Sequence, residues 1–276
     1  MKSNAHAQPP SLSKSSLDQL DEKYAWHPFS QTAERNVIPP IHVKTGKGSW
    51  LEDEEGNQYL DGYASAWTNV HGHCCKELDE ALKNQVEKIS HSTYLGLASE
   101  PASRLAQKLS ELTDNRLSRT FFTETGACAI EVAIKQSLRY WQLTEQKQRK
   151  ILISMDGAYH GDTFATMSLS DDGPFTTPWK EWALPVCRFK APTHHELGGE
   201  VFYSEQEESL QDLKRVLKKH KGKVASLILE PSVQGVAGMA QQPMGFLKKV
   251  SDLCKEEGCH LILDEIRDLQ LTNPLL

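Results

Sequence analysis

The stretch HLILDEI, residues 260–266, decides the fold class. Three aliphatic residues stand in a row directly before two carboxylates, Asp264 and Glu265. An unbroken aliphatic run of this kind is typical of a strand that is buried on both faces of a parallel sheet. In open α/β sheets, ligands bind beyond the carboxyl ends of the strands. We therefore predict that Asp264 lies at such an edge and faces a cationic group of a ligand.

Upstream of that stretch, short apolar segments alternate with amphipathic segments, which is the pattern of βαβ units. The fold class predicted from this pattern is α/β with a mostly parallel sheet. In the helix expected at residues 206–220, apolar residues recur on one face. The expected strands are residues 119–123, 150–155, 185–189, 224–230 and 260–264, and the expected helices between them are residues 127–142, 206–220 and 244–257.

The N-terminal part of the chain follows a different pattern. Residues 41–62 alternate between apolar and polar positions and are interrupted by glycine-containing turns, which predicts an antiparallel meander. Helices are expected at residues 77–90 and from Pro101 onward. Before the meander, Trp26 and Phe29 flank a proline, which excludes a helix interior. We favour a loop packed on the core there over an aromatic wall of a pocket.

Composition argues against several classes of function. The 276 residues carry a net charge of -6, which provides no basic surface for nucleic acid or an anionic membrane. No apolar run approaches the length that spans a membrane. The six cysteines are too sparse for a disulfide scaffold and favour a reducing, cytoplasmic location. Residues 1–16 lack the apolar segment of a secretory signal, and residues 1–23 are expected to form a disordered tail.

The loops after the expected strands contain residues suited to binding a ligand. Thr125 is a good helix N-cap, and the small residues Gly126 and Ala127 leave backbone N–H groups open to an anion such as phosphate. In the next loop Tyr159 lies between glycines, where a flat ring can approach a ligand closely. Glu230 opens a third loop, rich in proline and glycine. Each loop alone has an ordinary structural explanation, but the three together are a more specific indication of a ligand-binding site.

In order and spacing, these loops resemble the class III (ω-type) aminotransferases, which use pyridoxal 5'-phosphate (PLP). Within that group the chain is similar to the 7,8-diaminopelargonate aminotransferases of biotin synthesis. The resemblance covers nearly all of residues 24–266, and only the N-terminal part of a full-length family member. It is carried by residues 26–31 (WHPFSQ), 61–67 (DGYASAW), 69–73 (NVHGH), 91–93 (HST), 125–127 (TGA), 133–135 (AIK), 140–141 (YW), 159–163 (YHGDT) and 230–235 (EPSVQG).

The resemblance implies a set of cofactor contacts. The backbone amides of Gly126 and Ala127 would hold the cofactor phosphate at a helix N-terminus. Tyr159 would stack on the pyridine ring. Asp264 would pair with the ring nitrogen and keep it protonated, so that the ring withdraws electrons. Alanine at position 127 provides no hydroxyl of the kind that some relatives have there.

The resemblance also implies the domain plan and the partners. Phe29 and Trp67 would wall the substrate pocket, where a small-molecule amino donor and a keto acceptor bind. The resemblance does not decide whether the amino donor is S-adenosylmethionine or lysine. Another ω-aminotransferase substrate is an alternative to the biotin precursor. Full-length relatives are homodimers. The expected domains are a tail at 1–23, an N-terminal segment of the small domain at 24–95, a PLP-binding large domain of fold type I at 96–266, and a non-family tail at 267–276.

The residue that does the family's covalent chemistry is missing from this sequence. A lysine beyond the strand of Asp264 forms the Schiff base with the cofactor in the family. Twelve residues follow Asp264 here, and none is lysine. The implied fold also has two later strands between residues 119–123 and the rest of the sheet. We therefore interpret the chain as a C-terminally truncated member, and expect neither transaminase activity nor an absorption band of a lysine-bound cofactor.

Three other functions are the alternatives to this interpretation. An aliphatic strand ending in Asp-Glu also occurs in P-loop ATPases, but the glycines around Lys47 lack the rest of the phosphate-binding motif. A metal-binding module would draw on His71, His73, Cys74 and Cys75, with Cys254, Cys259 and His260 further on, but their spacings do not form paired Cys-x-x-Cys sites. The third alternative is a non-catalytic product that binds a full-length subunit, or a remnant without function. Its support is the missing lysine itself.

Overall fold

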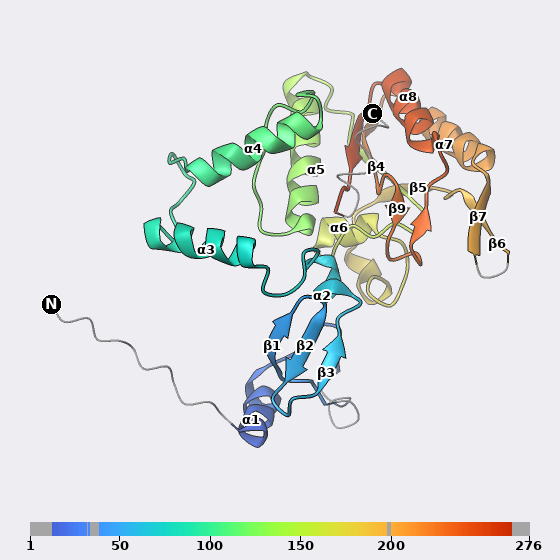
Figure 1. Cartoon of the computed structure of the whole chain (residues 1–276). Helices are drawn as coiled ribbons and strands as arrows, with labels where there is room; N and C mark the ends of the chain where they lie inside the picture. Colours follow the sequence, from blue (N-terminus) through green and yellow to red (C-terminus); the bar gives the residue numbers. More distant parts are fainter. Residues whose placement is uncertain (1–12, 32, 34–38, 198–199, 267–276) are drawn as a thin grey trace. The chain divides into compact units, whose positions relative to one another are not determined.

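The computed structural model describes residues 13–31, 33, 39–197 and 200–266 of the chain. The chain divides into two compact units, Met1–Leu97 and Ala98–Leu276. The elements of both units are labelled in Figure 1.

The N-terminal unit contains the predicted antiparallel meander. Strands β1 (Val43–Lys47), β2 (Trp50–Asp53) and β3 (Gln58–Leu60) pair in the order β1-β2-β3. The turn between β2 and β3 is closed by Asp53, and Gly56 adopts a φ of 83° there, a conformation that glycine tolerates best. The unit also holds helices α2 (Ala64–Trp67) and α3 (Lys76–Lys88). The helix expected at residues 77–90 is therefore confirmed.

Two expectations for this unit are wrong. A helix, α1 (Lys14–Tyr24), occupies the second half of the expected tail, because the Ser13 hydroxyl accepts a hydrogen bond from the Ser16 N–H and so caps the first turn. Residues 1–12 of that tail lie outside the described residues. The second error concerns Trp26 and Phe29, which are 82% and 72% exposed and so do not pack on a core.

The C-terminal unit is built on a parallel sheet of four strands in the order β11-β8-β4-β5. The α/β class with a mostly parallel sheet is confirmed. Strand β8 (Val224–Leu229) is central and buried along its whole length. Its neighbours are β11 (His260–Leu263), β4 (Ile151–Met155) and, beyond β4, β5 (Val186–Phe189).

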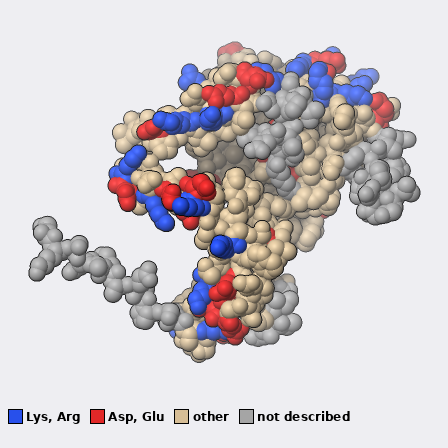
Figure 2. Space-filling model, in the orientation of Figure 1, with Lys and Arg blue, Asp and Glu red and all other residues tan. Residues whose placement is uncertain are grey.

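Helices cover both faces of this sheet (Figure 1). On one face, apolar residues of α7 (Glu207–Lys219) and α8 (Phe246–Glu257) pack against Leu227 and Leu229. On the other face, α5 (Gly126–Leu143) and α6 (Phe164–Leu169) pack against Ile228. The alternation along β8 places successive side chains on opposite faces, as strand geometry requires. On the face shown in Figure 2, charged side chains of both signs lie side by side along the helices.

The strand expected at residues 119–123 is not formed. The structure has no regular element there, and Phe121 is 66% exposed. Among the described residues β11 pairs with β8 alone, so the sheet ends at β11 and offers no neighbour to this segment. An extended segment needs a paired strand to become part of a sheet, because its backbone groups otherwise bond to water.

The remaining elements are short or peripheral. Helix α4 (Glu100–Leu112) matches the helix expected from Pro101, and η2 (Thr177–Trp182) is a 3₁₀ turn after α6. Two antiparallel pairs were not predicted: β6 (Thr193–Leu197) with β7 (Glu200–Glu205), and β9 (Val233–Gln234) with β10 (Ala240–Gln241). None of the helices described here is both long and apolar enough to cross a membrane. The expected tail at 267–276 lies outside the described residues.

Candidate functional site

The candidate site lies at the carboxyl ends of the parallel strands. The chain leaves β4 into the loop that holds Tyr159 and His160, and it leaves β8 directly into Glu230. It leaves β11 directly into Asp264, whose N–H donates to the Leu229 carbonyl at 2.9 Å and so prolongs the pairing with β8. Because parallel strands end at the same edge, these side chains meet there.

The N-terminus of α5 provides free backbone donors. Thr125 caps the helix, and its Oγ1 accepts a hydrogen bond of 3.1 Å from the Cys128 N–H. The N–H groups of Gly126 and Ala127, in the first turn, have no intrahelical partner, as at every helix start. No acceptor for them is found in the described part of the chain either. With the helix dipole, two such donors make a site for an anion.

A close backbone contact joins this helix to the loop after β4. Gly161 has a φ of 122°, and a Cβ placed on it would lie 2.6 Å from the Cβ of Ala127. Only glycine fits this position without displacement, for both reasons. On the other side of the helix start, a Cβ on Gly126 would lie 2.7 Å from Cδ1 of Ile266. The first turn of α5 is thus held between the loop after β4 and the residues after β11.

The loop after β4 is also joined to the end of β11 through a buried hydrogen bond. The Nδ1 of His160 lies 2.8 Å from Oδ2 of Asp264. The His160 side chain is fully buried, and that of Asp264 is 9% exposed. The other carboxylate oxygen, Oδ1, receives a long hydrogen bond of 3.4 Å from the Ile266 N–H. One oxygen of Asp264 is therefore firmly held, and the other has capacity for a stronger donor.

Glu230 joins two of the loops. Its Oε1 accepts from the Tyr159 N–H at 3.1 Å, and its Oε2 accepts from the Gly235 N–H at 2.8 Å. The residue is only 3% exposed. Burial raises the pKa of this carboxyl, and the two backbone hydrogen bonds offset part of that rise. Glu230 therefore fixes the backbone on which Tyr159 is carried.

The ring of Tyr159 is anchored at its far end. Its hydroxyl donates to Oδ2 of Asp162 at 2.7 Å, and the ring meets Phe175 edge-on at 6.4 Å between centroids. Burial raises the pKa of Tyr159, and the bond to Asp162 raises it further, so the ring stays neutral at physiological pH. A neutral aromatic ring held at both its backbone and its hydroxyl is suited to stacking on a flat ligand.

The structure therefore brings four of the predicted residues to one edge of the C-terminal unit: Gly126, Ala127, Tyr159 and Asp264. The predicted residues Phe29 and Trp67 belong to the N-terminal unit, where they are 72% and 40% exposed with φ angles of 54° and 65°. Their role stays a prediction. Sequence reasoning gave no role to His160 and Glu230, although both lie in the quoted motifs. A titratable residue directly after a buried strand was the available signal for Glu230.

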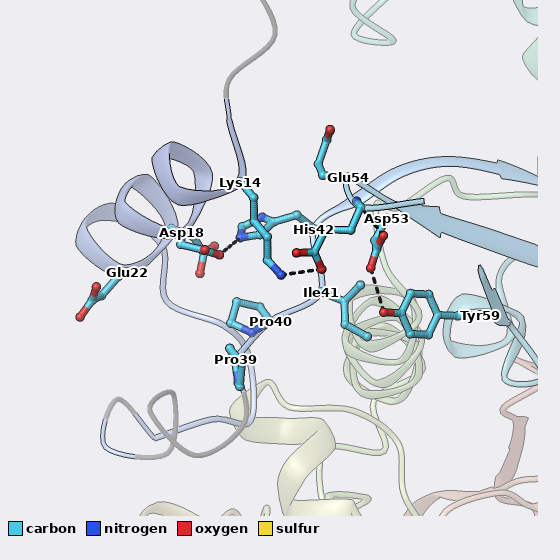
Figure 3. A pocket seen from close by; sticks show the side chains of 12 residues that line it. Lys14, Asp18, Glu22, Pro39, Pro40, Ile41, His42, Asp53, Glu54 and Tyr59 are labelled. Carbon is cyan, nitrogen blue, oxygen red and sulfur yellow. Dashed lines mark hydrogen bonds and ion pairs between the residues drawn. The ribbon is translucent and has the colours of Figure 1, made fainter. Parts of the chain in front are cut away.

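A separate cavity of about 500 Å³ lies in the N-terminal unit (Figure 3). Half of the residues that line it are acidic, and two of these acidic side chains are paired: Glu55 with Lys14 at 2.8 Å, and Asp18 with His42 at 2.8 Å. None of the six residues predicted for the site lines it. In the described part of the chain, no three His, Cys, Asp or Glu side chains are grouped to hold a metal ion.

Comparison with known proteins gives one family. The family model described as "Aminotransferase class-III" matches residues 30–268. Two curated relatives are named adenosylmethionine-8-amino-7-oxononanoate aminotransferase. The protein of Geobacter sulfurreducens is 38% identical over 259 residues, covering 93% of this chain and 57% of the relative. That of Staphylococcus aureus is 36% identical over 253 residues, covering 91% and 56%. The chain thus spans about half the length of the curated relatives it matches.

Solved structures give the same fold. The adenosylmethionine-8-amino-7-oxononanoate aminotransferase of Methanocaldococcus jannaschii superimposes with a TM-score of 0.84 at 36% identity, over 92% of this chain and 55% of that one. An (S)-enantioselective omega-transaminase of Thermomicrobium roseum gives a TM-score of 0.83 at 30% identity, over 92% and 57%. The expectation of the PLP-transferase fold of type I is confirmed by this likeness.

Proposed function

This chain belongs to the class III aminotransferase family, and from that premise we propose that it carries the cofactor-binding region of an adenosylmethionine-8-amino-7-oxononanoate aminotransferase. The reaction would transfer an amino group to 8-amino-7-oxononanoate and give 7,8-diaminononanoate, a step of biotin synthesis. The names of the relatives support the substrate, and the family match supports the reaction class. The buried hydrogen bond between His160 and Asp264 is the observation in this chain that carries the proposal.

The residues at the strand ends fit PLP. The free N–H groups of Gly126 and Ala127 at the start of α5 suit its phosphate, because a helix start binds anions through donors and dipole together. Asp264 has one oxygen available for the ring nitrogen. Tyr159, fixed at its backbone and its hydroxyl, would lie against the face of the ring. When bound, PLP supplies a protonated ring that accommodates the negative charge left on a substrate carbon.

The substrate and assembly roles extend this proposal. Phe29 and Trp67 would wall the pocket for the amino donor and the keto acceptor, and the protein would act as a homodimer like its relatives. Another ω-amine in place of the biotin precursor is the alternative substrate. The amino donor of the reaction would be either S-adenosylmethionine or lysine.

The 276-residue polypeptide is proposed to bind the cofactor without bonding to it covalently. The family's chemistry requires a lysine beyond Asp264, and residues 265–276 contain none. Gly126, Ala127, Tyr159 and Asp264 are present and belong to one unit. This combination predicts a chain that holds the cofactor and does not turn over substrate by itself.

Calorimetric titration with pyridoxamine 5'-phosphate tests the cofactor site. This form of the cofactor has no aldehyde and so does not react with surface lysines. We expect saturable binding at one site per chain, and a loss of about tenfold or more in affinity for Asp264→Asn, because a charged hydrogen bond to the ring nitrogen is replaced by a neutral one. Asp252→Asn is the matched control, since Asp252 is an exposed residue of α8 paired with Lys248.

Two results would contradict the proposal. Equal affinity in the two asparagine variants would remove Asp264 from the site. Conversion of 8-amino-7-oxononanoate by the purified 276-residue polypeptide, with either amino donor, would show that the chain needs no lysine beyond Asp264. Borohydride treatment with PLP, followed by peptide mapping, should show no single preferred lysine.

A second candidate function is the binding of a full-length subunit by a non-catalytic chain. The sheet described here ends at β11, and Phe121, Tyr140 and Leu143 line an apolar groove beside α5 while being 49–67% exposed. Unpaired strand edges and exposed apolar surface favour association with another chain. Co-expression with the Geobacter sulfurreducens relative and a pull-down tests this. Recovery of the relative with wild type but not with Phe121→Asp supports it, and no recovery overturns it.

A further inference from the structure

His160 is a fully buried titratable side chain at the candidate site. Its ring has no solvent exposure, and its Nδ1 lies 2.8 Å from Oδ2 of Asp264. Its backbone N–H is also fixed, by a hydrogen bond of 2.9 Å to the Ser170 hydroxyl. The other ring nitrogen, Nε2, is buried and meets no hydrogen-bonding partner among the described residues. One side of the ring is therefore fully engaged, and the other lacks a partner.

This asymmetry decides where the proton lies. If Asp264 were protonated, Nδ1 would accept and the hydrogen of the neutral ring would sit on Nε2, where a buried donor has no acceptor. If the ring were doubly protonated, a positive charge would be buried with the same unpaired donor. Burying an unpaired donor or a charge costs more free energy than leaving one lone pair unused. The arrangement that remains is a neutral ring with its hydrogen on Nδ1, donating to an ionised Asp264.

A neutral donor leaves the carboxylate with its full charge. A cationic partner would compensate the charge of Asp264, whereas a neutral N–H only orients it. With Oδ2 held by His160, the rotation of the carboxyl group is fixed and Oδ1 is directed to a second donor. Glu230 is another acidic group that interacts with this pair, and a negative charge on it would not compensate Asp264 either.

His160 also couples two cofactor contacts. It follows Tyr159 in the chain, and the Tyr159 N–H is held by Glu230 at 3.1 Å. The bond from His160 to Asp264 therefore ties the loop that carries the stacking ring to the end of β11. A displacement of Asp264 would be transmitted to the position of Tyr159 through a single residue.

We propose that His160 is a positioning residue: as a neutral Nδ1–H donor it fixes an ionised Asp264 so that Oδ1, which accepts only a long hydrogen bond from the Ile266 N–H, is directed at the ring nitrogen of the cofactor. The inference deepens the proposed function and rests on it. His160 itself does not touch the cofactor. Its effect is to keep the ring nitrogen protonated by keeping the charge of Asp264 uncompensated and its geometry fixed.

The first test is made on the cofactor-free 276-residue chain and is independent of the proposed function. Nitrogen-15 NMR of histidine-labelled protein distinguishes a protonated ring nitrogen from a bare one. At neutral pH the His160 resonances, assigned by their loss in His160→Asn, should show one protonated nitrogen, Nδ1, and one bare nitrogen, Nε2. A doubly protonated ring, or a hydrogen on Nε2, overturns the proposal.

The second test compares two amide variants with bound pyridoxamine 5'-phosphate labelled at its ring nitrogen. The asparagine side-chain nitrogen takes nearly the place of Nδ1, whereas the glutamine nitrogen takes nearly that of Nε2. His160→Asn should keep affinity within about threefold and keep the ring nitrogen protonated. His160→Gln should lose about tenfold in affinity, the size of one charged hydrogen bond, and shift the ring nitrogen toward its unprotonated form.

The outcomes separate the two claims. Absence of pyridoxamine 5'-phosphate binding in wild type contradicts the proposed function and leaves the NMR test of His160 standing. Wild-type binding with an unchanged ring-nitrogen signal in His160→Gln overturns the positioning role, even where affinity falls, because a merely structural loss would not alter protonation. Circular dichroism melts of both variants identify unfolding. If His160→Gln does not fold, an unprotonated ring nitrogen in bound His160→Asn overturns the proposal by itself.

Discussion

Asp53 in the N-terminal unit and Glu230 in the C-terminal unit are both buried carboxylates that hold a loop by accepting backbone N–H groups. Their pKa values move in opposite directions. Hydrogen bonds, foremost from the Asn57 side chain, lower the pKa of Asp53 to about 2. Burial raises the pKa of Glu230 above its ordinary value. Backbone hydrogen bonds thus favour the charged carboxylate in both units, but at Glu230 the effect of burial outweighs them.

The difference lies in the number of donors and in what covers the carboxylate. Asp53 receives four hydrogen bonds of 2.8–2.9 Å from its own turn, two from backbone N–H groups and two from the side chains of Asn57 and Tyr59. Glu230 receives two, lies beneath the strand ends and has the negative Asp264 nearby. The hydrogen bonds of Asp53 stabilise the turn in the meander. At the strand ends, the carboxyl of Glu230 is buried although burial disfavours its charged form, which is typical of functional sites.

Removal of the Glu230 side chain should have the largest effect on the free energy of unfolding. Glu230→Ala leaves the Tyr159 and Gly235 N–H groups without an acceptor and opens a cavity, so we expect a loss of about 3 kcal/mol in the free energy of unfolding. Glu230→Gln keeps one acceptor oxygen and should lose about 1 kcal/mol. Urea unfolding followed by circular dichroism measures both. Equal losses would mean that the two hydrogen bonds contribute little.

Addition of one methyl group at Gly161 should have the next largest effect. Gly161→Ala forces a Cβ to within 2.6 Å of Ala127 at a φ of 122°, and we expect a loss of about 2 kcal/mol in the free energy of unfolding. Gly173→Ala is the control, because no atom lies within 4 Å of its added Cβ. Urea unfolding of the two variants checks this. A stability for Gly161→Ala equal to that of the control would show that the loop and α5 are not in contact.

The pH dependence of stability should show the smallest effect, with opposite signs in the two units. Asp53 has a lowered pKa, so its contribution is present above pH 3.8 and is lost as pH falls toward 2. Glu230 has a raised pKa, so its contribution is present below pH 4.5 and is lost as pH rises through its folded value. Amide hydrogen exchange, read separately in the two units, should therefore show Asp53→Asn differing from wild type above pH 3.8 and converging with it at lower pH. The difference between Glu230→Gln and wild type should instead change as pH rises from 4.5. If the stability contributions of Asp53 and Glu230 changed in the same direction with pH, the proposed difference between the two units would be wrong.

Sequence patterns predicted the strands that are buried on both faces of the sheet and the helices that have a periodic apolar face. Strands β4, β5, β8 and β11 and helices α5, α7 and α8 follow from aliphatic runs and apolar faces, because burial dictates those residues. The short helix α6, between β4 and β5, was not predicted. The segment at 119–123 has a similar composition, yet forms no strand. Its state depends on a neighbouring strand, which is a property of the whole sheet and not of the segment. Helix α1 was missed because its composition is polar and its cap is a single serine.

The candidate site was predictable in its backbone donors and its carboxylate, and much less so in what connects them. Gly126, Ala127 and Asp264 sit at strand and helix ends that any α/β pattern identifies. His160 and Glu230 act through partners 104 and 71 residues away in the chain. A single sequence contains no signal for such pairings, since each is created by the order of the strands.

Those long separations have a kinetic consequence. Closing a loop of 104 residues between His160 and Asp264 carries an entropic cost that local contacts do not have, and it is recovered only when β11 has docked on β8. The helices and the meander can form from neighbouring residues at once. We therefore expect the proposed cofactor contacts to be among the last features to assemble during folding, and the first to be lost when the edge strand opens.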